Sequence, residues 1–409
     1  MAYEFNEIID CEVCGSHDLD SVLNLGAHPM CDDLVPVGDS RVCQEYPIEI
    51  LFCSKCCTAH QRFQIPKHLL FPKDYHFRSR HTTDILNGMR QFTEACEKIT
   101  GKFHGKKILD IGCNDGSLLS FFSQKGADTY GIEPTAAASD AASLGHKVIN
   151  DFFTPVLAKE FVSEHGNPDL ITFTNVFAHI ENLREVIDAL NILSSGKTMI
   201  VIENHYLGSI LKKNQFDTFY HEHPRTYSYT SFTYIADALG MRIAKVDFPE
   251  RYGGNIRVFM VSNKQIFTHD QLVELKGVEK NFRECFQQLA INIERWRVRK
   301  LEELSFYIKN NKLAAKAFPG RSAIPIKLLG LNEETISAVF EKSASSKIGH
   351  YIPGTRIPIC SDDDFDEPET PLLNLAWHIS DEIEGFMRSR GFKGKLINII
   401  GAQDFIDHT

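Results

Sequence analysis

The segment that decides the fold of this 409-residue chain is KILDIGCNDG, residues 107–116. Its apolar first half, 107–111, has the pattern of a buried strand, and its second half is a turn of glycine and polar residues that leads into a helical pattern from about Ser117. Apolar runs alternating with helical patterns continue along the chain, at 129–132, 148–149, 169–173 and 198–202, with helices expected from Ala136 and Asn182. This alternation predicts an α/β fold with a doubly wound, Rossmann-like central sheet.

Composition places the chain among ordinary globular proteins and argues against several function classes. Hydrophobic residues make up 43% and charged residues 24% of the sequence, and no apolar run approaches the roughly 18 residues of a membrane span. The net charge is −10 with no basic block, so we expect neither nucleic acid nor a membrane as partner. The first residues, MAYEFNEIID, lack the apolar core of a secretory signal. We therefore expect a cytoplasmic protein, with a monomer favoured.

Two cysteine pairs lie near the start of the sequence. Cys11 and Cys14 form one CxxC turn, and Cys53 and Cys56 form a second one after a strand-like run. In a reducing compartment, paired cysteines of this spacing indicate metal binding more often than a disulfide. Four thiolates would close a tetrahedral site with no position for water, so we expect a structural Zn²⁺. The alternative is two unrelated CxxC turns, and Cys57 is either a spare ligand or an ordinary thiol.

The turn after the first predicted strand carries the residues of a cofactor site. Asp110, Gly112, Asn114 and Asp115 lie in it, and Glu133 follows about 20 residues later, where Rossmann-like sheets place a carboxylate for a ribose diol. The phosphate-binding GxGxxG pattern is absent, and an acidic turn would repel a pyrophosphate. It suits a cationic amino-acid cofactor and resembles the first motif of the class I S-adenosylmethionine (SAM) methyltransferases. The alternative is an ordinary βα turn with a solvated acid.

Titratable side chains occur at two further places. The strand at 169–173 runs on into Asn175, an expected cofactor contact, and His179, at the sheet edge where ligands bind in open α/β folds. The block FYHEHP, residues 219–224, holds three groups able to transfer protons beside a proline, which is typical of general acid–base chemistry. The alternatives are an ordinary helix-start histidine at 179 and a metal site at the HxH spacing.

Several motifs occur together in the order known for one family. They are CxxCG at 11–15, LGAHPM at 25–30, CxxC at 53–56, GCNDGSLL at 112–119, GIEP at 131–134, YHEH at 220–223, GGNIR at 253–257 and PGT at 353–355. In this set the chain resembles the SAM-dependent nucleotide-sugar C-methyltransferases over essentially its whole length. We expect an N-terminal zinc-binding domain, a class I methyltransferase domain, a helical linker and a smaller C-terminal α/β domain that helps to hold a nucleotide-linked sugar, at 1–80, 81–265, 266–312 and 313–409.

The resemblance also implies a mechanism. In that family a 4-keto nucleotide sugar loses its C3 proton to a histidine base, and the enolate attacks the methyl group of SAM. The resemblance assigns the base to His223, the second histidine of YHEH, and implies that Tyr220, Glu222 and His179 line the site. The residues suit this chemistry, because a ketone acidifies the adjacent C–H bond and Tyr220 or His179 could donate to the enolate oxygen.

One departure from the family pattern precedes the methyltransferase domain. Where a Tyr- and Ser-rich stretch is usual, this chain reads DYHFRSRHT at 74–82. It leaves Tyr75 as the expected active-site tyrosine and adds Arg78 and Arg80. These arginines could hold a diphosphate or a sugar acid, since the guanidinium fork matches phosphate geometry, or they could form a solvated basic patch.

A second departure, FPGRSAIP at 318–325, replaces a small-residue turn and leaves the nucleotide and the sugar open. In the GGNIR motif, Asn255 and Arg257 are expected to contact the substrate. Two other functions remain as alternatives: SAM-dependent methylation of an oxygen or nitrogen of another small metabolite, and a zinc-binding scaffold with a degenerate SAM fold.

Overall fold

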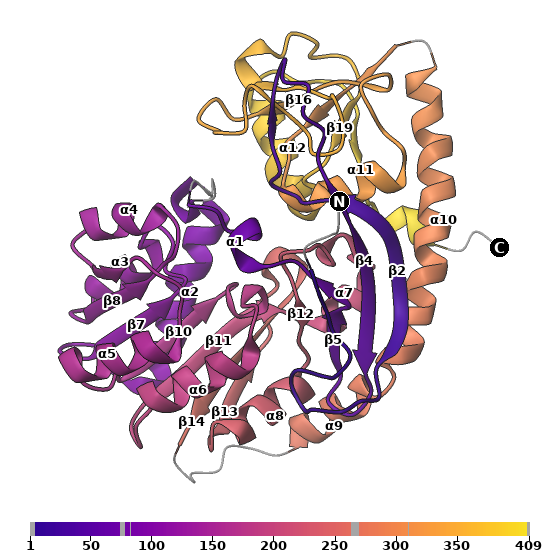
Figure 1. The fold of residues 1–409 in the computed structure, drawn as a ribbon. Helices are drawn as coiled ribbons and strands as arrows, with labels where there is room; N and C mark the ends of the chain where they lie inside the picture. The colour runs from indigo at the N-terminus through magenta and orange to yellow at the C-terminus, as the bar shows by residue number, and fades with distance from the viewer. Residues whose placement is uncertain (1–4, 74–77, 82, 263–269, 310, 407–409) are drawn as a thin grey trace.

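The computed structural model describes residues 5–73, 78–81, 83–262, 270–309 and 311–406. Three larger sheets make up the framework: a seven-stranded sheet in the middle of the chain, a four-stranded sheet built mainly from the N-terminal part, and a five-stranded sheet in the C-terminal part (Figure 1). A long helix runs beside the N-terminal sheet and reaches the C-terminal part.

The central sheet has the strand order β13-β14-β11-β10-β7-β8-β9. Its strands are β7 (Lys107–Ile111), β8 (Asp128–Ile132), β9 (Lys147–Ile149), β10 (Leu170–Thr174), β11 (Met199–His205), β13 (Arg242–Asp247) and β14 (Asn255–Val261). The strands from β11 to β9 are parallel, whereas β14 is antiparallel to both of its neighbours. The predicted doubly wound sheet is confirmed. Its order reverses between β7 and β10, so the carboxyl ends of these strands flank a ligand-binding crevice.

Helices cover both faces of this sheet because its strands are apolar on both sides. Leu109 and Ile171 pack in one cluster with α5 (Pro155–His165) and α6 (Leu183–Leu193). Ile108 and Leu170 pack in another cluster with α2 (Thr83–Thr100) and α3 (Ser117–Ser123). The other helices of this part of the chain are α4 (Ala137–Ser143), α7 (Leu207–Lys212) and α8 (Tyr229–Ala238).

The N-terminal sheet has the order β12-β5-β4-β2, with β2 (Asp20–Pro29), β4 (Glu45–Cys53) and β5 (Thr58–Gln61) from the N-terminal part. Its fourth strand, β12 (Arg225–Thr226), directly follows the YHEH block and pairs antiparallel with β5. The methyltransferase part of the chain therefore completes the sheet that carries the second cysteine pair, and the two units share backbone hydrogen bonds.

The predicted helical linker contains α9 (Asp270–Glu279) and α10 (Phe282–Ile308). Helix α10 lies along β2 (Figure 1), and its buried stripe includes Phe286 and Trp296. The Phe286 ring packs on Phe52 of β4, and the Trp296 indole donates to the carbonyl of Ile399 at 2.8 Å. This helix is thus packed against both the N-terminal and the C-terminal sheets.

The C-terminal sheet has five parallel strands in the order β18-β16-β15-β19-β20. They are β15 (Leu313–Lys316), β16 (Ile336–Glu341), β18 (Ile359–Ser361), β19 (Leu372–Asn374) and β20 (Leu396–Asn398), with helices α11 (Ala323–Leu328) and α12 (Ser380–Ser389). Its strand order reverses between β15 and β19, which creates a second crevice of the kind that binds ligands. A short pairing of β3 (Val35–Pro36) with β17 (His350–Tyr351) ties this domain to the N-terminal part.

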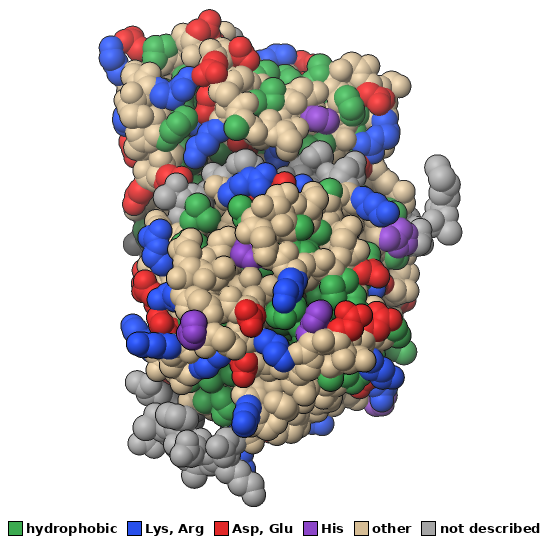
Figure 2. Space-filling model, turned by 90° about the vertical axis from the view of Figure 1, so that its left-hand side faces the viewer, with side chains coloured by type: hydrophobic (Ala, Val, Ile, Leu, Met, Phe, Trp, Pro, Cys, Tyr) green, Lys and Arg blue, Asp and Glu red, His purple; other side chains and the backbone are tan. Residues whose placement is uncertain are grey.

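Helix length and surface charge bear on what this chain can contact. Across the described ranges, every helix is too short or too polar to cross a bilayer. Figure 2 shows acidic and basic side chains interspersed over this face, so the net negative charge is not gathered there.

Candidate functional site

A cavity of about 1020 Å³ lies between the carboxyl ends of the central and C-terminal sheets. Its wall combines side chains from three parts of the chain, and a site of this size has room for a cofactor and a substrate together. The N-terminal part contributes Cys31 and Asp32, the central sheet Asp110, Glu133, His179, His205 and His223, and the C-terminal domain Phe318, Arg321, Lys347 and His378.

The turn after β7 forms one end of this cavity. Gly112 adopts a φ of +70°, and a Cβ there would lie 2.6 Å from both γ-carbons of Val176, so only glycine fits. The Asp110 side chain is buried and accepts a hydrogen bond from the Thr172 hydroxyl at 2.7 Å. Burial raises the pKa of Asp110 to about 7. This carboxyl therefore gains from a cationic or hydrogen-bonding ligand, which suits the amino-acid part of SAM.

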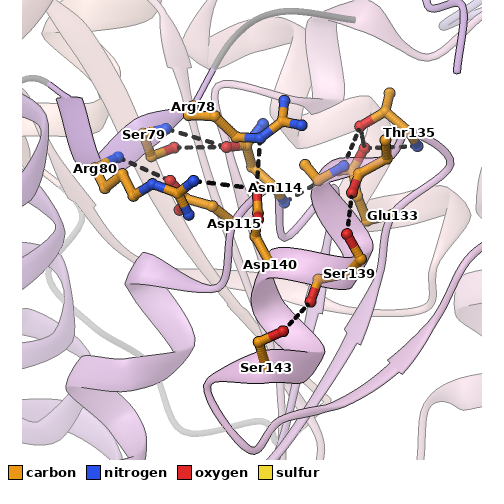
Figure 3. A network of polar contacts seen from close by, with 12 residues as sticks. Arg78, Ser79, Arg80, Asn114, Asp115, Glu133, Thr135, Ser139, Asp140 and Ser143 are labelled. Carbon is orange, nitrogen blue, oxygen red and sulfur yellow. Dashed lines mark hydrogen bonds and ion pairs between the residues drawn. The ribbon is translucent and has the colours of Figure 1, made fainter. Parts of the chain in front are cut away.

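Glu133 closes the same end of the cavity from the tip of β8 (Figure 3). One carboxylate oxygen accepts the backbone N–H of Asn114 at 3.0 Å, and the other accepts the N–H and hydroxyl of Thr135 at 3.0 and 2.6 Å. The side chain is only 5% exposed, yet it lines the cavity. Three donors hold it in place, and the oxygen that accepts from Asn114 keeps an unused lone pair that can accept from a ribose hydroxyl.

Asp115 takes a different place from its neighbours in the turn. Within the described chain it does not belong to the cavity wall, and its side chain is fully buried. Its oxygens accept the backbone N–H of Arg80 at 2.9 Å and the Ser117 hydroxyl at 2.6 Å. The structure thus gives Asp115 the role of a support that ties the 78–80 segment to the cofactor turn, rather than that of a ligand contact.

Arg78 and Arg80 both reach Asp140 on α4, at 2.7 and 3.3 Å (Figure 3). The Arg78 hydrogen bond is the largest cause that lowers the pKa of Asp140. Between the arginines, the backbone N–H of Ser79 donates to Asn114 Oδ1 at 3.1 Å. Both arginines line the cavity, and their ion pairs with Asp140 fasten the 78–80 segment over the cofactor turn; the Arg78 side chain is half-buried and that of Arg80 is exposed. Tyr75, the predicted active-site tyrosine, lies outside the described residues.

Three imidazole rings meet at the centre of the cavity. The ring centroid of His223 lies 4.7 Å from that of His179, 5.4 Å from that of His205 and 4.3 Å from the Tyr220 ring. Sequence reasoning missed His205, because the expected strand ended at Ile202 whereas β11 continues to His205. The polar run that ends this strand at the carboxyl edge of the sheet was the available signal.

Hydrogen bonds define which nitrogen of each ring carries the proton. His223 Nδ1 lies 2.8 Å from the carbonyl oxygen of Thr218, and His179 Nδ1 lies 2.7 Å from that of Glu222. A carbonyl oxygen only accepts, so Nδ1 is the protonated nitrogen in both rings and Nε2 keeps its lone pair. Desolvation lowers the pKa of His179 to about 4 and that of His223 well below its usual range. Both rings are therefore neutral at pH 7.

The other members of the YHEH block divide between the cavity and the protein interior. Tyr220 and Glu222 line the cavity. Desolvation, with Glu222 nearby, raises the pKa of Tyr220 well above its usual range, so its hydroxyl stays protonated and can donate. His221 points elsewhere: its Nε2 donates to the carbonyl of Tyr46 at 3.1 Å, which makes it a structural contact to β4.

Asn175 lines the cavity, but Asn255 and Arg257 lie behind it. Of the residues that the structure describes, neither of the latter two forms part of the cavity wall, and their exposed fractions are 0% and 4%. Arg257 Nε pairs with the buried Glu203 at 2.6 Å, and Asn255 donates to Glu203 and to Asn175 at 3.1 Å each. The geometry does not support the expected substrate contacts, because cross-strand pairing of β14 with β11 directs both side chains to Glu203.

The four predicted metal ligands, Cys11, Cys14, Cys53 and Cys56, converge in the N-terminal domain. All four Sγ atoms lie within 4.8 Å of one another, with separations of 3.3 Å for Cys11–Cys56 and 3.6 Å for Cys14–Cys53. Tetrahedral Zn–S bonds of about 2.3 Å require sulfur separations of about 3.8 Å, so this donor set fits zinc. Zinc binds cysteine as the thiolate, so these sulfurs would release their protons when the metal binds.

A buried chain of contacts joins this cluster to the histidines. Glu12 lies between the first two cysteines and pairs with Arg225 at 2.6 Å. Burial alone would raise the pKa of Glu12, but Arg225 and His60 lower it to about 2. The fully buried Arg225 guanidinium also donates to the carbonyls of Ile180 and Glu181, which directly follow His179. The cysteine cluster therefore supports the loop that presents His179.

Comparison with known proteins agrees with this architecture. Three family profiles match consecutive parts of the chain: a zinc binding domain at 11–71, a methyltransferase domain at 83–246 and a C-methyltransferase C-terminal domain at 250–400. The chain is 27% identical over 386 residues to the C-methyltransferase NovU of Streptomyces niveus, covering 92% of this chain and 91% of that protein.

More distant similarities involve only the central part. A ubiquinone biosynthesis O-methyltransferase of Acinetobacter baylyi is 27% identical over 118 residues, which is 28% of this chain and 47% of that protein. Among solved structures, magnesium protoporphyrin IX methyltransferase of Synechocystis with bound SAH aligns with a TM-score of 0.34 and 17% identity, over 43% of this chain and 84% of that one.

The three profiles appear in the order expected from the sequence motifs, and the zinc-compatible cysteine cluster and the cofactor turn occupy the matching domains. The chain therefore belongs to the SAM-dependent C-methyltransferases that combine a zinc-binding domain, a methyltransferase domain and a C-methyltransferase C-terminal domain.

Proposed function

We propose that this enzyme methylates the carbon next to the keto group of a nucleotide-linked sugar, with His223 as the base. The observation that carries the proposal is the neutral His223 ring in the cavity, whose Nδ1–H is held by the Thr218 carbonyl. Its Nε2 lone pair is thereby available for a proton from the substrate. His221, the other histidine of the block, donates its Nε2–H to the carbonyl of Tyr46. Because this nitrogen already carries a proton, it is unsuited to the role of base.

The proposed reaction begins with proton removal from carbon. A ketone acidifies the adjacent C–H bond, the proton moves to Nε2 of His223, and the electron pair becomes an enolate; a positioned base contributes about 10²–10⁴ in rate. The protonated hydroxyl of Tyr220, whose ring adjoins His223, supplies a donor for the enolate oxygen. Bound SAM supplies an electrophilic methyl group, so that one C–C bond forms as the C–S bond breaks.

The residues around the cofactor turn are proposed to hold SAM beside this base. Glu133 would accept from the ribose hydroxyls, while Asp110, Asn114 and Asn175 line the same end of the cavity. Gly112 allows the ligand to approach the backbone. Both ligands would thus be aligned in one cavity, which is what methyl transfer between two bound molecules requires.

The nucleotide end of the substrate is proposed to lie against the C-terminal sheet. Residues that follow β15, β16 and β19 line the cavity at the second sheet-order reversal, where α/β folds bind nucleotides. Lys347, near Phe318, donates to the Phe318 carbonyl at 3.0 Å and lies 3.6 Å from Asp32. Asp32, with further carboxylates nearby, outweighs burial and raises the pKa of Lys347, so a cation faces this end of the cavity.

The test is a screen of nucleoside-diphosphate 4-keto sugars with SAM, in which mass spectrometry detects the gain of a methyl group. Deuterium wash-in at the substrate carbon without SAM separates this function from O- or N-methylation, since only the enolate route exchanges that proton. His223→Gln should abolish the exchange, and His221→Gln serves as the matched control from the same block. Undiminished exchange in a folded, zinc-loaded His223→Gln protein would refute the assignment of the base.

A further inference from the structure

The loop that carries the YHEH block is gripped by a side chain from the C-terminal domain. Arg321, in the turn after β15, donates from its guanidinium to both oxygens of Asp217, with Nε–Oδ2 at 2.8 Å and Nη2–Oδ1 at 2.6 Å. The same NH2 group donates to the Thr218 hydroxyl at 2.6 Å. Paired N–H donors on one carboxylate form a rigid fork, so this contact fixes orientation as well as distance.

A second side chain of the C-terminal domain also binds Asp217. The indole Nε1 of Trp377 donates to Asp217 Oδ2 at 2.8 Å, and the Arg321 guanidinium lies 5.6 Å from the Trp377 ring centroid. Asp217 is fully buried, so its charge depends on these contacts for compensation. We call Arg321, Asp217 and Trp377 the clamp.

The clamp lies one hydrogen bond away from the proposed base. Thr218 is bound at its hydroxyl by Arg321, and its carbonyl accepts the Nδ1–H of His223 at 2.8 Å. Any movement of this peptide would release the bond that selects the tautomer of the ring. We propose that Arg321 is a positioning residue, which acts through Asp217 and Thr218 to hold His223 with Nε2 directed to the substrate. The inference rests on the proposed role of His223 as base.

The charge of Arg321 acts in the same direction. The groups around His223 are His179 from the loop after β10, His205 from β11, Tyr220 from its own loop, and Arg321. Glu222 and His378 line the same cavity. Desolvation is the main cause that lowers the pKa of His223, and His179, His205 and Arg321 lower it further. Loss of the guanidinium should therefore raise the pKa of His223 and allow partial protonation of the base.

This arrangement offers a reason why residues 318–325 differ from the small-residue turn that is usual in the family. The turn sends Arg321 across the domain boundary, where its guanidinium is occupied by Asp217 and Thr218. The C-terminal domain would then do more than bind substrate, because the base is oriented only while this domain is docked.

The test compares three variants with a control. Arg321→Met/Asp217→Asn removes both charges together and avoids a buried unpaired carboxylate, Arg321→Lys keeps the charge without the fork, and Trp377→Phe removes one donor. Asp404→Asn is the matched control, since it weakens a different buried ion pair, Lys300–Asp404 at 3.1 Å, which joins α10 to the C-terminal domain and shares no residue with the clamp. Zinc content and thermal unfolding establish that each protein is folded.

The direct readout is NMR of protein labelled with ¹⁵N-histidine, with the His223 signals assigned by their loss in His223→Gln. The wild type and Asp404→Asn should show the Nδ1–H tautomer and a pKa below the usual 6.5. The double variant should show mixed tautomers and kcat lower by about 100-fold with little change in KM. Arg321→Lys should keep the low pKa but lose part of kcat, and Trp377→Phe should have the smallest effect.

The outcomes separate this inference from the proposed function. An unchanged His223 tautomer in the folded double variant would overturn the clamp, whatever the substrate. If the tautomer shifts as expected but wild-type enzyme shows no deuterium exchange with any keto sugar, the clamp stands and the proposed function fails.

Discussion

Gly112 provides a sharp test of how closely the cofactor turn is packed. Alanine at this position would add a methyl group at a φ of +70°, 2.6 Å from both γ-carbons of Val176. The left-handed backbone costs a non-glycine residue about 1–2 kcal/mol, and forcing a methyl group into a packed neighbour costs about 1–3 kcal/mol more. Gly105 has the same φ of +70° with open space around its Cβ, so Gly105→Ala incurs only the first cost.

We expect Gly112→Ala to lower the free energy of unfolding in urea by about 2–5 kcal/mol, and Gly105→Ala by about 1–2 kcal/mol. In calorimetric titration with SAM, affinity should fall at least about 10-fold for Gly112→Ala, which corresponds to about 1.4 kcal/mol, and should not change for Gly105→Ala. Adding Val176→Ala to Gly112→Ala removes both clashing carbons and should recover part of each loss. Equal behaviour of the two single variants would refute the close-packing argument.

Three further predictions concern protons, metal and charge. Because desolvation lowers the pKa of His179 to about 4 and that of His223 well below 6.5, the initial rate should stay level as pH falls to 6.5 and decline only below it; an acidic limb centred above 6.5 would contradict a neutral base. Both rings bind fewer protons in the folded than in the unfolded state between their lowered pKa and about 6.5, so the free energy of unfolding should increase as pH rises across that window and fall as the solution is acidified, as measured in urea titrations. Removal of zinc by a chelator, or Cys53→Ser, should lower the melting temperature by several degrees and reduce activity through the Glu12–Arg225 contact, whereas a melting curve indifferent to chelator would argue against a structural metal. Asp140→Asn weakens the anchoring of the 78–80 segment and should reduce SAM affinity about two- to five-fold in titration, with no loss of zinc; unchanged affinity would mean that this anchoring is irrelevant to the cofactor.

Local sequence was sufficient for several elements of the central domain, although it did not predict strands β13 and β14. Strand β7 occupies 107–111 as predicted, because a short apolar run ends at a glycine that needs a positive φ. Helix α6 begins after Asn182, whose side chain accepts the backbone N–H of Glu185 at 3.2 Å. The metal-binding cysteines could also be predicted from the sequence. Each CxxC turn is a local arrangement, and a tetrahedral zinc site needs two such pairs.

Neighbours across the sheet decided other side chains. Asn255 and Arg257 lie opposite His205 and Glu203 on β11. Both side chains bind the buried carboxylate of Glu203 and therefore point away from the cavity. Cross-strand partners depend on register, which spacing along one strand does not reveal. The same applies to His205, whose place at the cavity follows from the length of β11 within the sheet.

The sequence by itself determined the three-domain plan, the zinc ligands, the cofactor turn and the block that supplies the candidate base, because each depends on residues close together in the chain. Only the tertiary structure decided how these parts are oriented. Arg321 meets Asp217 across about a hundred positions of sequence, and Arg225 meets Glu12 across about two hundred. Buried charges must find partners somewhere in the folded chain, and which partners they find depends on how whole domains dock.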